Sequence, residues 1–156
     1  MNAPRRVSPD EDVRQVLALI QSEFAYMEAR IDPPSSMHRL DVDAIRAQAE
    51  AGEVWVIEED DAPVACVFLT AKPGVLYLGK LAVLARMRGR GLARRLVEVA
   101  ADRARARGLD VVELQTRVEL VENHATFARF GFVKTGETAH AGYDRPTSIT
   151  MQLRLA

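Results

Sequence analysis

The chain contains little cysteine, no long apolar segment and almost no net charge. Its one cysteine, Cys66, excludes an internal disulfide. Because Cys66 lies in the apolar run APVACVFLT, we interpret it as a small buried hydrophobic residue rather than a catalytic thiol. No run of about 18 apolar residues is present, so we expect no membrane span. The N-terminal MNAPRR also lacks the apolar stretch of a signal peptide. These absences predict a cytoplasmic protein.

The charge balance does not indicate a polyanionic partner. The formal net charge is −1 and the sequence pI is about 6.3, so we expect neither nucleic acid nor an acidic membrane to bind. The 156 residues fit one domain, residues 1–156, which is long enough to bury a core without disulfides.

Hydrophobic patterning predicts seven strands and four helices. The predicted strands are RRV, EVWVIEE, PVACVFLTA, VLYLGKLAVL, DVVELQTRV, GFVKTGE and SITMQLRL. The predicted helices cover Val13 to Phe24, Asp41 to Glu50, Leu92 to Gly108 and the stretch NHATFARF, with Ser8 or Asp10 and Asn123 as candidate N-caps. Their order along the chain predicts an α/β (α+β) protein with a mixed, mostly antiparallel sheet and helices on both faces.

The stretch RMRGRGLARR, residues 86 to 95, holds five arginines and two glycines between a predicted strand and a predicted helix. Glycine lets the backbone approach a ligand closely, and the first N–H groups of a helix have no partner inside it. The helix dipole and the guanidinium groups add positive potential at the same place. We therefore expect the backbone amides of residues 88 to 93 to hold a phosphate or pyrophosphate.

Two familiar phosphate loops do not fit this turn well. A P-loop needs a lysine followed by serine or threonine, and neither residue type occurs here. The dinucleotide motif G-x-G-x-x-G is matched by Gly89 and Gly91, but its last position is Arg94. The preceding strands also form a predicted hairpin rather than a βαβ unit.

The segment LAVLARMRGRGLARRLVEVA resembles the acetyl-CoA-binding segment of the GCN5-related N-acetyltransferase (GNAT) superfamily. The superfamily signature [RQ]-x-x-G-x-[GA] is met by Arg88, Gly91 and Ala93, and a second register begins at Arg86. The later segment ENHATFARFGF is similar to the family's helix that ends in Gly-Phe. The resemblance covers essentially the whole chain and implies the acyl-CoA N-acyltransferase fold.

The resemblance also implies which residues hold the co-substrate acetyl-CoA. In the family, the pantetheine arm pairs with the end of the central strand, and an amine attacks the acetyl carbonyl directly. The residues expected to bind acetyl-CoA on this basis are Leu81, Val83, Arg88, Gly89, Arg90, Gly91, Ala93, Arg94, Asn123 and Phe127. No metal is implied.

The sequence departs from the family pattern at the catalytic acid. Many members carry a tyrosine in the later helix, where this chain has Phe127, and some place a glutamate in the central strand, where this chain has Gly79 and Lys80. The loop HAGYDRPT supplies His140 as a candidate base and Tyr143 as a candidate hydroxyl donor. Either side chain could instead belong to an ordinary solvated turn.

The loop RIDPPSSMH is expected to face the same cleft, because family members build the acceptor site from this region. Arg30, Asp32 and Ser36 are the candidate acceptor-binding residues, and a proline-stiffened connector is the alternative. A small amine or amino-acid derivative is the first expected acceptor, ahead of a protein N-terminus or lysine.

The sequence therefore predicts an N-acetyltransferase that uses acetyl-CoA. A CoA-binding sensor with the same fold and no turnover is the alternative, because Phe127 cannot donate a proton. Homodimers are common in the family, and the resemblance allows one here.

Overall fold

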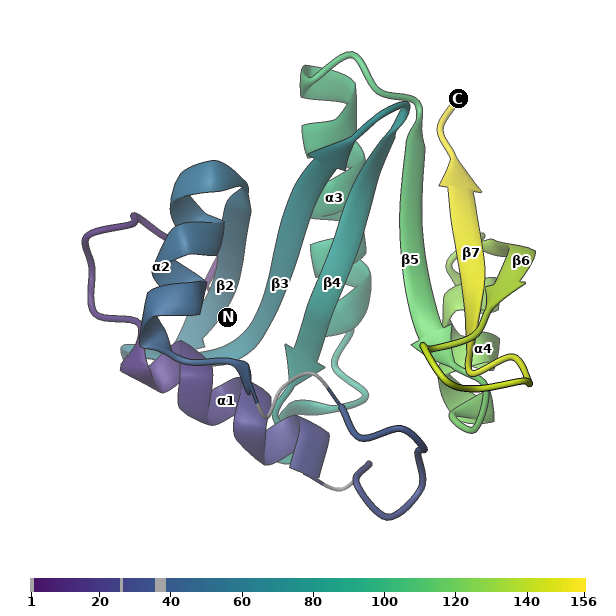
Figure 1. Cartoon of the computed structure of the whole chain (residues 1–156). Coiled ribbons are helices and arrows are strands. Elements are labelled where there is room, and N and C mark those ends of the chain that lie inside the picture. Colours follow the sequence, from purple (N-terminus) through teal and green to yellow (C-terminus); the bar gives the residue numbers. More distant parts are fainter. Residues whose placement is uncertain (1, 26, 36–38) are drawn as a thin grey trace.

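A computed structural model describes residues 2–25, 27–35 and 39–156 (Figure 1). Within these residues, seven strands form one sheet in the order β1-β2-β3-β4-β5-β7-β6. The strands are β1 (Arg5–Arg6), β2 (Glu53–Glu59), β3 (Ala62–Lys72), β4 (Val75–Val83), β5 (Val111–Arg117), β6 (Val133–Thr138) and β7 (Ser148–Arg154). All neighbours pair antiparallel except β4 and β5, which are parallel. The predicted mixed, mostly antiparallel sheet is confirmed.

In the described part of the chain, four α-helices cover the sheet: α1 (Arg14–Ala25), α2 (Val42–Ala51), α3 (Leu92–Ala106) and α4 (Val121–Arg129), with a 3-10 turn, η2 (Ala85–Met87), before α3. Asp41 caps α2 by accepting a hydrogen bond from the backbone of Ala44. The prediction that Asn123 caps α4 is wrong, because Leu120 holds that position and Asn123 lies inside the first turn. Helix α1 begins within one residue of the predicted Val13, but the predicted caps Ser8 and Asp10 are wrong, because Asp12 accepts the backbone N–H of Arg14.

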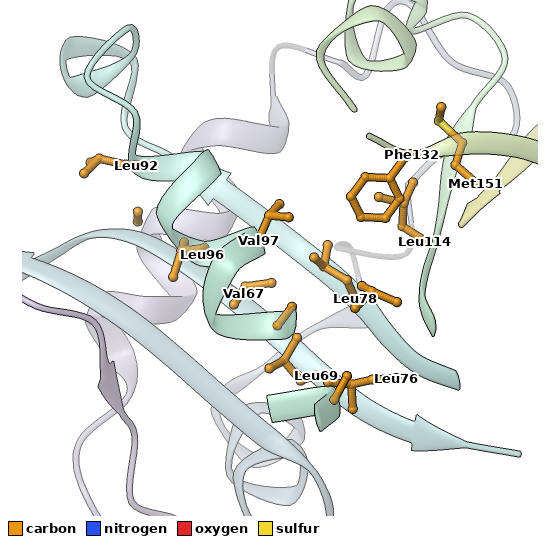
Figure 2. Close-up of a cluster of buried hydrophobic side chains, with 14 of the residues drawn as sticks. Val67, Leu69, Leu76, Leu78, Leu92, Leu96, Val97, Leu114, Phe132 and Met151 are labelled. Atoms are coloured by element: carbon orange, nitrogen blue, oxygen red, sulfur yellow. The ribbon is translucent and has the colours of Figure 1, made fainter. Parts of the chain in front are cut away.

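Apolar cores lie on both faces of the sheet. On one face, α3 packs against β3, β4 and β5 around Leu69, Leu78 and Leu96 (Figure 2). On the other face, α1 and α2 pack against β2 and β3 around Ile20 and Ile45. Because both faces of the sheet are buried, the sequences of β3 and β4 are apolar at nearly every position.

Cys66 belongs to the core between the sheet and α1 and α2. It is fully buried, and burial raises the pKa of its thiol to about 12. The thiol therefore stays protonated at neutral pH, and the interpretation of Cys66 as a small buried residue is confirmed.

A β-bulge interrupts β4 near its end. The single residue Val67 of β3 lies opposite both Lys80 and Leu81 of β4. Lys80 has a φ of 50°, a left-handed conformation that glycine adopts far more easily than lysine. The extra residue changes the alternation, so that both Leu78 and Leu81 pack into the core under α3.

The two parallel strands separate after a short paired stretch. They pair only at Leu76 with Val112 and at Tyr77 with Glu113. Beyond these pairs β4 continues to Val83 and β5 continues to Arg117. Figure 1 shows the two strands moving apart toward these ends, while β7 stays beside β5. The backbone groups of β4 that face β5 beyond Tyr77 are therefore left without a ladder partner.

Within the described part of the chain, no helix is both long enough and apolar enough to cross a membrane.

Candidate active site

Two cavities open where β4 and β5 diverge. The first, here called the α3 cavity, has a volume of about 470 Å³ and lies between the end of β4, the turn before α3, and helices α1 and α4. The second, the β4–β5 cavity, has a volume of about 690 Å³ and lies between the diverging strands. Residues that line both cavities are Phe24, Met27, Leu81, Asn123 and Phe127. The cavities therefore meet at the end of the central strand.

The turn before α3 presents a row of backbone donors to the α3 cavity. Gly89 and Gly91 have φ values of 79° and 78°, and Gly91 is the N-cap of α3 without a side-chain cap. Among the described residues, the N–H groups of residues 89 to 94 donate to no backbone or side-chain acceptor. These donors stand at the positive end of the α3 dipole. The N–H groups of residues 89 to 93 are thus free as predicted, whereas the prediction is wrong for residue 88, because the N–H of Arg88 donates to the carbonyl of Ala85 at 3.2 Å.

The arginines of the turn differ in their surroundings. Arg88 is half exposed, and its Nη2 lies 3.7 Å from Oε2 of the buried Glu23. Arg94 lies over the ring of Phe130, with 4.8 Å from Cζ to the ring centroid. Arg90 is exposed and lines neither cavity. The two outer arginines bond away from the turn, Arg86 to Glu59 and Arg95 to the carbonyl of Asn2.

Nine of the ten residues expected to bind acetyl-CoA line the α3 cavity. They are Leu81, Val83, Arg88, Gly89, Gly91, Ala93, Arg94, Asn123 and Phe127. Phe127 packs edge-on against Phe130 and Phe132, at centroid distances of 6.3 and 5.6 Å, which fixes its ring between the two cavities.

Among the described residues, the charged side chains that line the β4–β5 cavity are all cationic: Arg39, Lys80 and Arg117. Burial lowers the pKa of Lys80, and the charges of Arg39 and Arg117 lower it further. Lys80 Nζ lies 5.9 Å from the ring centroid of Phe24, at the wall shared with the α3 cavity. The cavity thus combines apolar walls with concentrated positive charge.

His140 lines the β4–β5 cavity, and Tyr143 does not. The ring Nδ1 of His140 hydrogen-bonds to the hydroxyl of Thr147, and its backbone N–H donates to the same oxygen at 2.9 Å. Desolvation lowers the pKa of His140, and the charge of Arg117 lowers it further. At neutral pH this imidazole is therefore mostly unprotonated and can accept a proton.

The hydroxyl of Tyr143 donates to Asp32 Oδ1 at 2.6 Å. This bond, with a smaller effect of desolvation, raises the pKa of Tyr143. Arg145 donates to Oδ2 of the same aspartate at 3.3 Å. The predicted acceptor residue Asp32 is thus bonded to the loop between β6 and β7 and does not line either cavity.

The segment that follows α1 is held against β5 and α4 by further polar contacts. Arg30 pairs with both carboxylate oxygens of Glu122 rather than with Glu28 or Asp32. Arg117 donates to the carbonyls of Pro33 and Pro34 at 2.7 and 3.0 Å. Arg30 lines neither cavity, and the predicted acceptor residue Ser36 lies outside the described residues.

Sequence reasoning missed four charged residues of this region: Glu23, Arg39, Lys80 and Arg117. A charge inside the apolar run VLYLGKLAVL was the available signal for Lys80. Glu23 in a helix, Arg39 in a loop and Arg117 at a strand end are charged residues at positions where charge is common, so the sequence carried no signal for them. Their convergence on the site depends on tertiary structure.

No group of three or more His, Cys, Asp and Glu side chains suited to a metal ion occurs among the described residues.

Comparison with known proteins agrees with the fold. A model of the Acetyltransferase (GNAT) family matches residues 15–132. Probable N-acetyltransferase 14 of Danio rerio is 33% identical over 100 residues, which cover 62% of this chain and 36% of that relative. The chain thus corresponds to little more than a third of that relative's length.

Two solved structures share the fold at low sequence identity. An acetyltransferase of the GNAT family from Staphylococcus aureus superposes with a TM-score of 0.77 at 14% identity and covers 99% of this chain and 100% of its own. A Bacillus subtilis acetyltransferase, solved in complex with CoA, superposes with a TM-score of 0.70 at 17% identity and covers 99% of both chains. Because the family match covers residues 15–132, which is well over half of the chain, the chain belongs to the acetyltransferase (GNAT) family.

Proposed function

We propose that the protein is an N-acetyltransferase that moves the acetyl group of acetyl-CoA to the primary amine of a small molecule, such as an amino-acid derivative. The main support is the meeting of the two cavities at Leu81 and Phe127, which joins an anion-binding turn to a separate chamber between the diverging strands. Family membership supports acyl-CoA as the donor.

The turn and the central strand bind different parts of acetyl-CoA. The free N–H groups of residues 89 to 94, with Arg88 and Arg94, bind the pyrophosphate. The pantetheine arm lies along Leu81 to Val83, where the backbone of β4 facing β5 has no ladder partner. The acetyl carbonyl then reaches the junction of the two cavities, and a free N–H of β4 stabilises its developing oxyanion.

The transfer forms one bond and breaks another. The amine nitrogen bonds to the acetyl carbon, and the bond from that carbon to the CoA sulfur breaks, without an acyl-enzyme intermediate. An amine of pKa about 10 is mostly protonated at neutral pH, so it must first lose a proton. We assign this proton to His140, which lines the β4–β5 cavity and is mostly neutral at pH 7.

Phe127 stands where many family members carry a tyrosine, and its ring has no proton to give to the departing thiolate. A thiol of pKa about 8.5 is a fair leaving group, and the thiolate can take its proton from solvent. We give Tyr143 a positioning role, since its hydroxyl proton is committed to Asp32 and it lines neither cavity. Through Asp32 it holds the segment after α1 beside the acceptor chamber.

Replacement of His140 by glutamine is expected to lower kcat by about 100-fold or more, within the usual range for loss of a general base. In the parent enzyme kcat/KM should fall as pH drops below about 6.5, because the lowered pKa of His140 places its protonation there. This acid limb should disappear in His140→Gln. The measurement is a pH profile of initial rates.

Tyr143→Phe serves as the comparison for that profile. It removes the hydrogen bond to Asp32 and should raise the acceptor KM by about three- to tenfold while leaving the acid limb in place. An unchanged acid limb in His140→Gln, or its loss in Tyr143→Phe, would reverse the two assignments.

The first test of the proposed function is calorimetric titration with acetyl-CoA, CoA and NAD in parallel, followed by an amine screen with thiol detection. Saturable binding of acetyl-CoA but not NAD, with thiol release on adding an amine, is the expected result. Binding of acetyl-CoA without transfer to any amine would favour a CoA sensor. Binding of neither CoA species by folded protein would exclude the function.

A further inference from the structure

The β4–β5 cavity carries an electrostatic feature that amine acetylation alone does not explain. An incoming amine is itself cationic before it loses its proton, yet the charged side chains on the cavity wall are Arg39, Lys80 and Arg117. The described residues that line this cavity include no aspartate or glutamate. A chamber with this wall repels a purely cationic acceptor and attracts one that brings its own negative charge.

The charge of Arg117 is not neutralised by an ion pair among the described residues. Its guanidinium donates to the carbonyls of Pro33 and Pro34, which are uncharged acceptors. A guanidinium has five N–H donors, so these two bonds leave further donors available. Burial lowers the pKa of Arg117, but arginine remains protonated at neutral pH. Its positive charge therefore persists at the end of β5.

Carboxylates do occur near Arg117, but they lie outside the cavity wall. Asp32, Glu28 and Glu119 each act to raise its pKa. Asp32 is occupied by Tyr143 and Arg145, and Glu119 accepts the backbone N–H of Asp32. None of these three carboxylates lines the β4–β5 cavity, whereas Arg39, Lys80 and Arg117 do.

Lys80 lies beside the place where the acetyl group is proposed to react. It is the bulge residue of β4, one position before Leu81, where the proposed acetyl group arrives. Its φ of 50° is costly for lysine, and glycine or asparagine would adopt it more easily. A lysine kept in a strained bulge beside the reaction centre points to a use for its ammonium group.

Resting on the proposed acetyl transfer, we infer that the acceptor is a small amine that also carries a carboxylate, and that Lys80 and Arg117 bind this carboxylate. The chamber of about 690 Å³ is large enough for an amino acid together with the acetyl group. Arg39 adds positive potential at the same wall. A carboxylate held there lets the amine approach the thioester without net charge repulsion.

Paired acceptors provide the test. Common L-amino acids and their α-amides differ by one negative charge at nearly constant size, and thiol release reports their acetylation. Within each pair that reacts, kcat/KM should be about tenfold or more higher for the acid, as expected for loss of charge-assisted hydrogen bonds. Equal or faster reaction of the amides, or of decarboxylated amines, would overturn the inference.

Lys80→Asn tests the residue itself, because asparagine tolerates the left-handed conformation and carries no charge. It should lower kcat/KM for the acids by about tenfold or more and change kcat/KM for the amides by less than about twofold. The Kd for acetyl-CoA should stay unchanged. Lys72→Asn is the matched control, since Lys72 lines neither cavity and contacts the ring of Tyr77. An equal loss for acids and amides, or weaker acetyl-CoA binding, would instead assign Lys80 to the chemistry or to the donor site.

A binding measurement separates this inference from the proposed function. N-acetyl amino acids and their amides are titrated into the parent protein and Lys80→Asn by calorimetry in the presence of CoA. If no amine is acetylated but the N-acetyl acids bind and Lys80→Asn weakens them, the transfer reaction fails and the carboxylate site stands. If transfer occurs and no N-acetyl acid binds in preference to its amide, the carboxylate site fails and the transfer stands.

Discussion

Glutamate in place of Gly91 is expected to abolish acetyl-CoA binding, with a Kd raised by more than about 100-fold, because like charges placed together cost several kcal/mol. Gly91 is the N-cap of α3, and its own N–H belongs to the row of free backbone donors. A Cβ built there meets nothing within 4 Å, although the φ of 78° strains any residue other than glycine. The carboxylate occupies and neutralises the place proposed for the pyrophosphate.

Two control variants separate the charge from the backbone effect. Gly74 has the same φ of 78° and the same open space, but it lies in the turn between β3 and β4, away from both cavities. Gly74→Glu should therefore lose a similar amount of stability and keep the parent Kd. Gly91→Gln keeps the side-chain size without the charge and should bind with intermediate affinity. Calorimetry gives the Kd values, and thermal unfolding confirms that each variant is folded.

An unchanged Kd in Gly91→Glu would place the pyrophosphate elsewhere. Equal weakening by Gly74→Glu and Gly91→Glu would mean that backbone strain, rather than charge at the turn, is responsible.

The glycine-arginine turn and the elements beside it could be predicted because they are contiguous in the sequence, whereas Asn123 and Phe127 came from the family resemblance. The strand, the turn and the start of the helix occupy residues 75 to 106 without interruption. Glycine at positive φ followed by a helix N-terminus presents free backbone N–H groups in any fold, so the local sequence is sufficient to predict this part of the site. Among the predicted donor-binding residues, Arg90 alone lines neither cavity, because nothing local determines which arginine of a cluster faces a ligand.

The acceptor side could not be predicted because its residues meet only through tertiary contacts. Arg30 pairs with Glu122, 92 residues away, and Tyr143 pairs with Asp32, 111 residues away. Residues chosen from the loop sequence for their chemistry were thus bonded to distant partners. The bulge at Lys80 was also hidden, because a lysine at positive φ contradicts local preference. Such a contradiction is expected at functional sites, where local rules are violated for a reason.

The second large effect concerns stability rather than the active site. Glu53 begins β2, is fully buried and accepts hydrogen bonds from Trp55, Arg103 and Arg107 at distances from 2.6 to 3.2 Å. These bonds tie the second strand of the sheet to the end of α3. Glu53→Gln is expected to lower the free energy of unfolding by about 3 kcal/mol at pH 7, the lower end for a broken buried ion pair. The lower end applies because both arginines remain about a third exposed and can be hydrated.

The effect of Glu53→Gln should depend on pH in a defined direction. Burial acts to raise the pKa of Glu53, but the bonds from Arg103, Trp55 and Arg107 outweigh it and lower the pKa from 4.5 to about 2. A carboxyl group with a lowered pKa in the folded state stabilises the protein above its unfolded pKa. That contribution is lost as the pH falls from 4.5 toward 2, so the parent and the variant should converge over this interval.

Glu58→Gln is the matched control on the same strand. Glu58 pairs with Arg5 at 3.0 Å, but both side chains reach solvent, and such pairs contribute less than about 1 kcal/mol. Urea unfolding followed by circular dichroism from pH 7 to about pH 2 gives both differences. Because Arg103 and Arg107 lie at the opposite end of α3 from Gly91, Glu53→Gln should leave the Kd for acetyl-CoA within about twofold. A loss below about 1 kcal/mol, or one that persists at the lowest pH, would show that the arginines do not depend on the Glu53 charge.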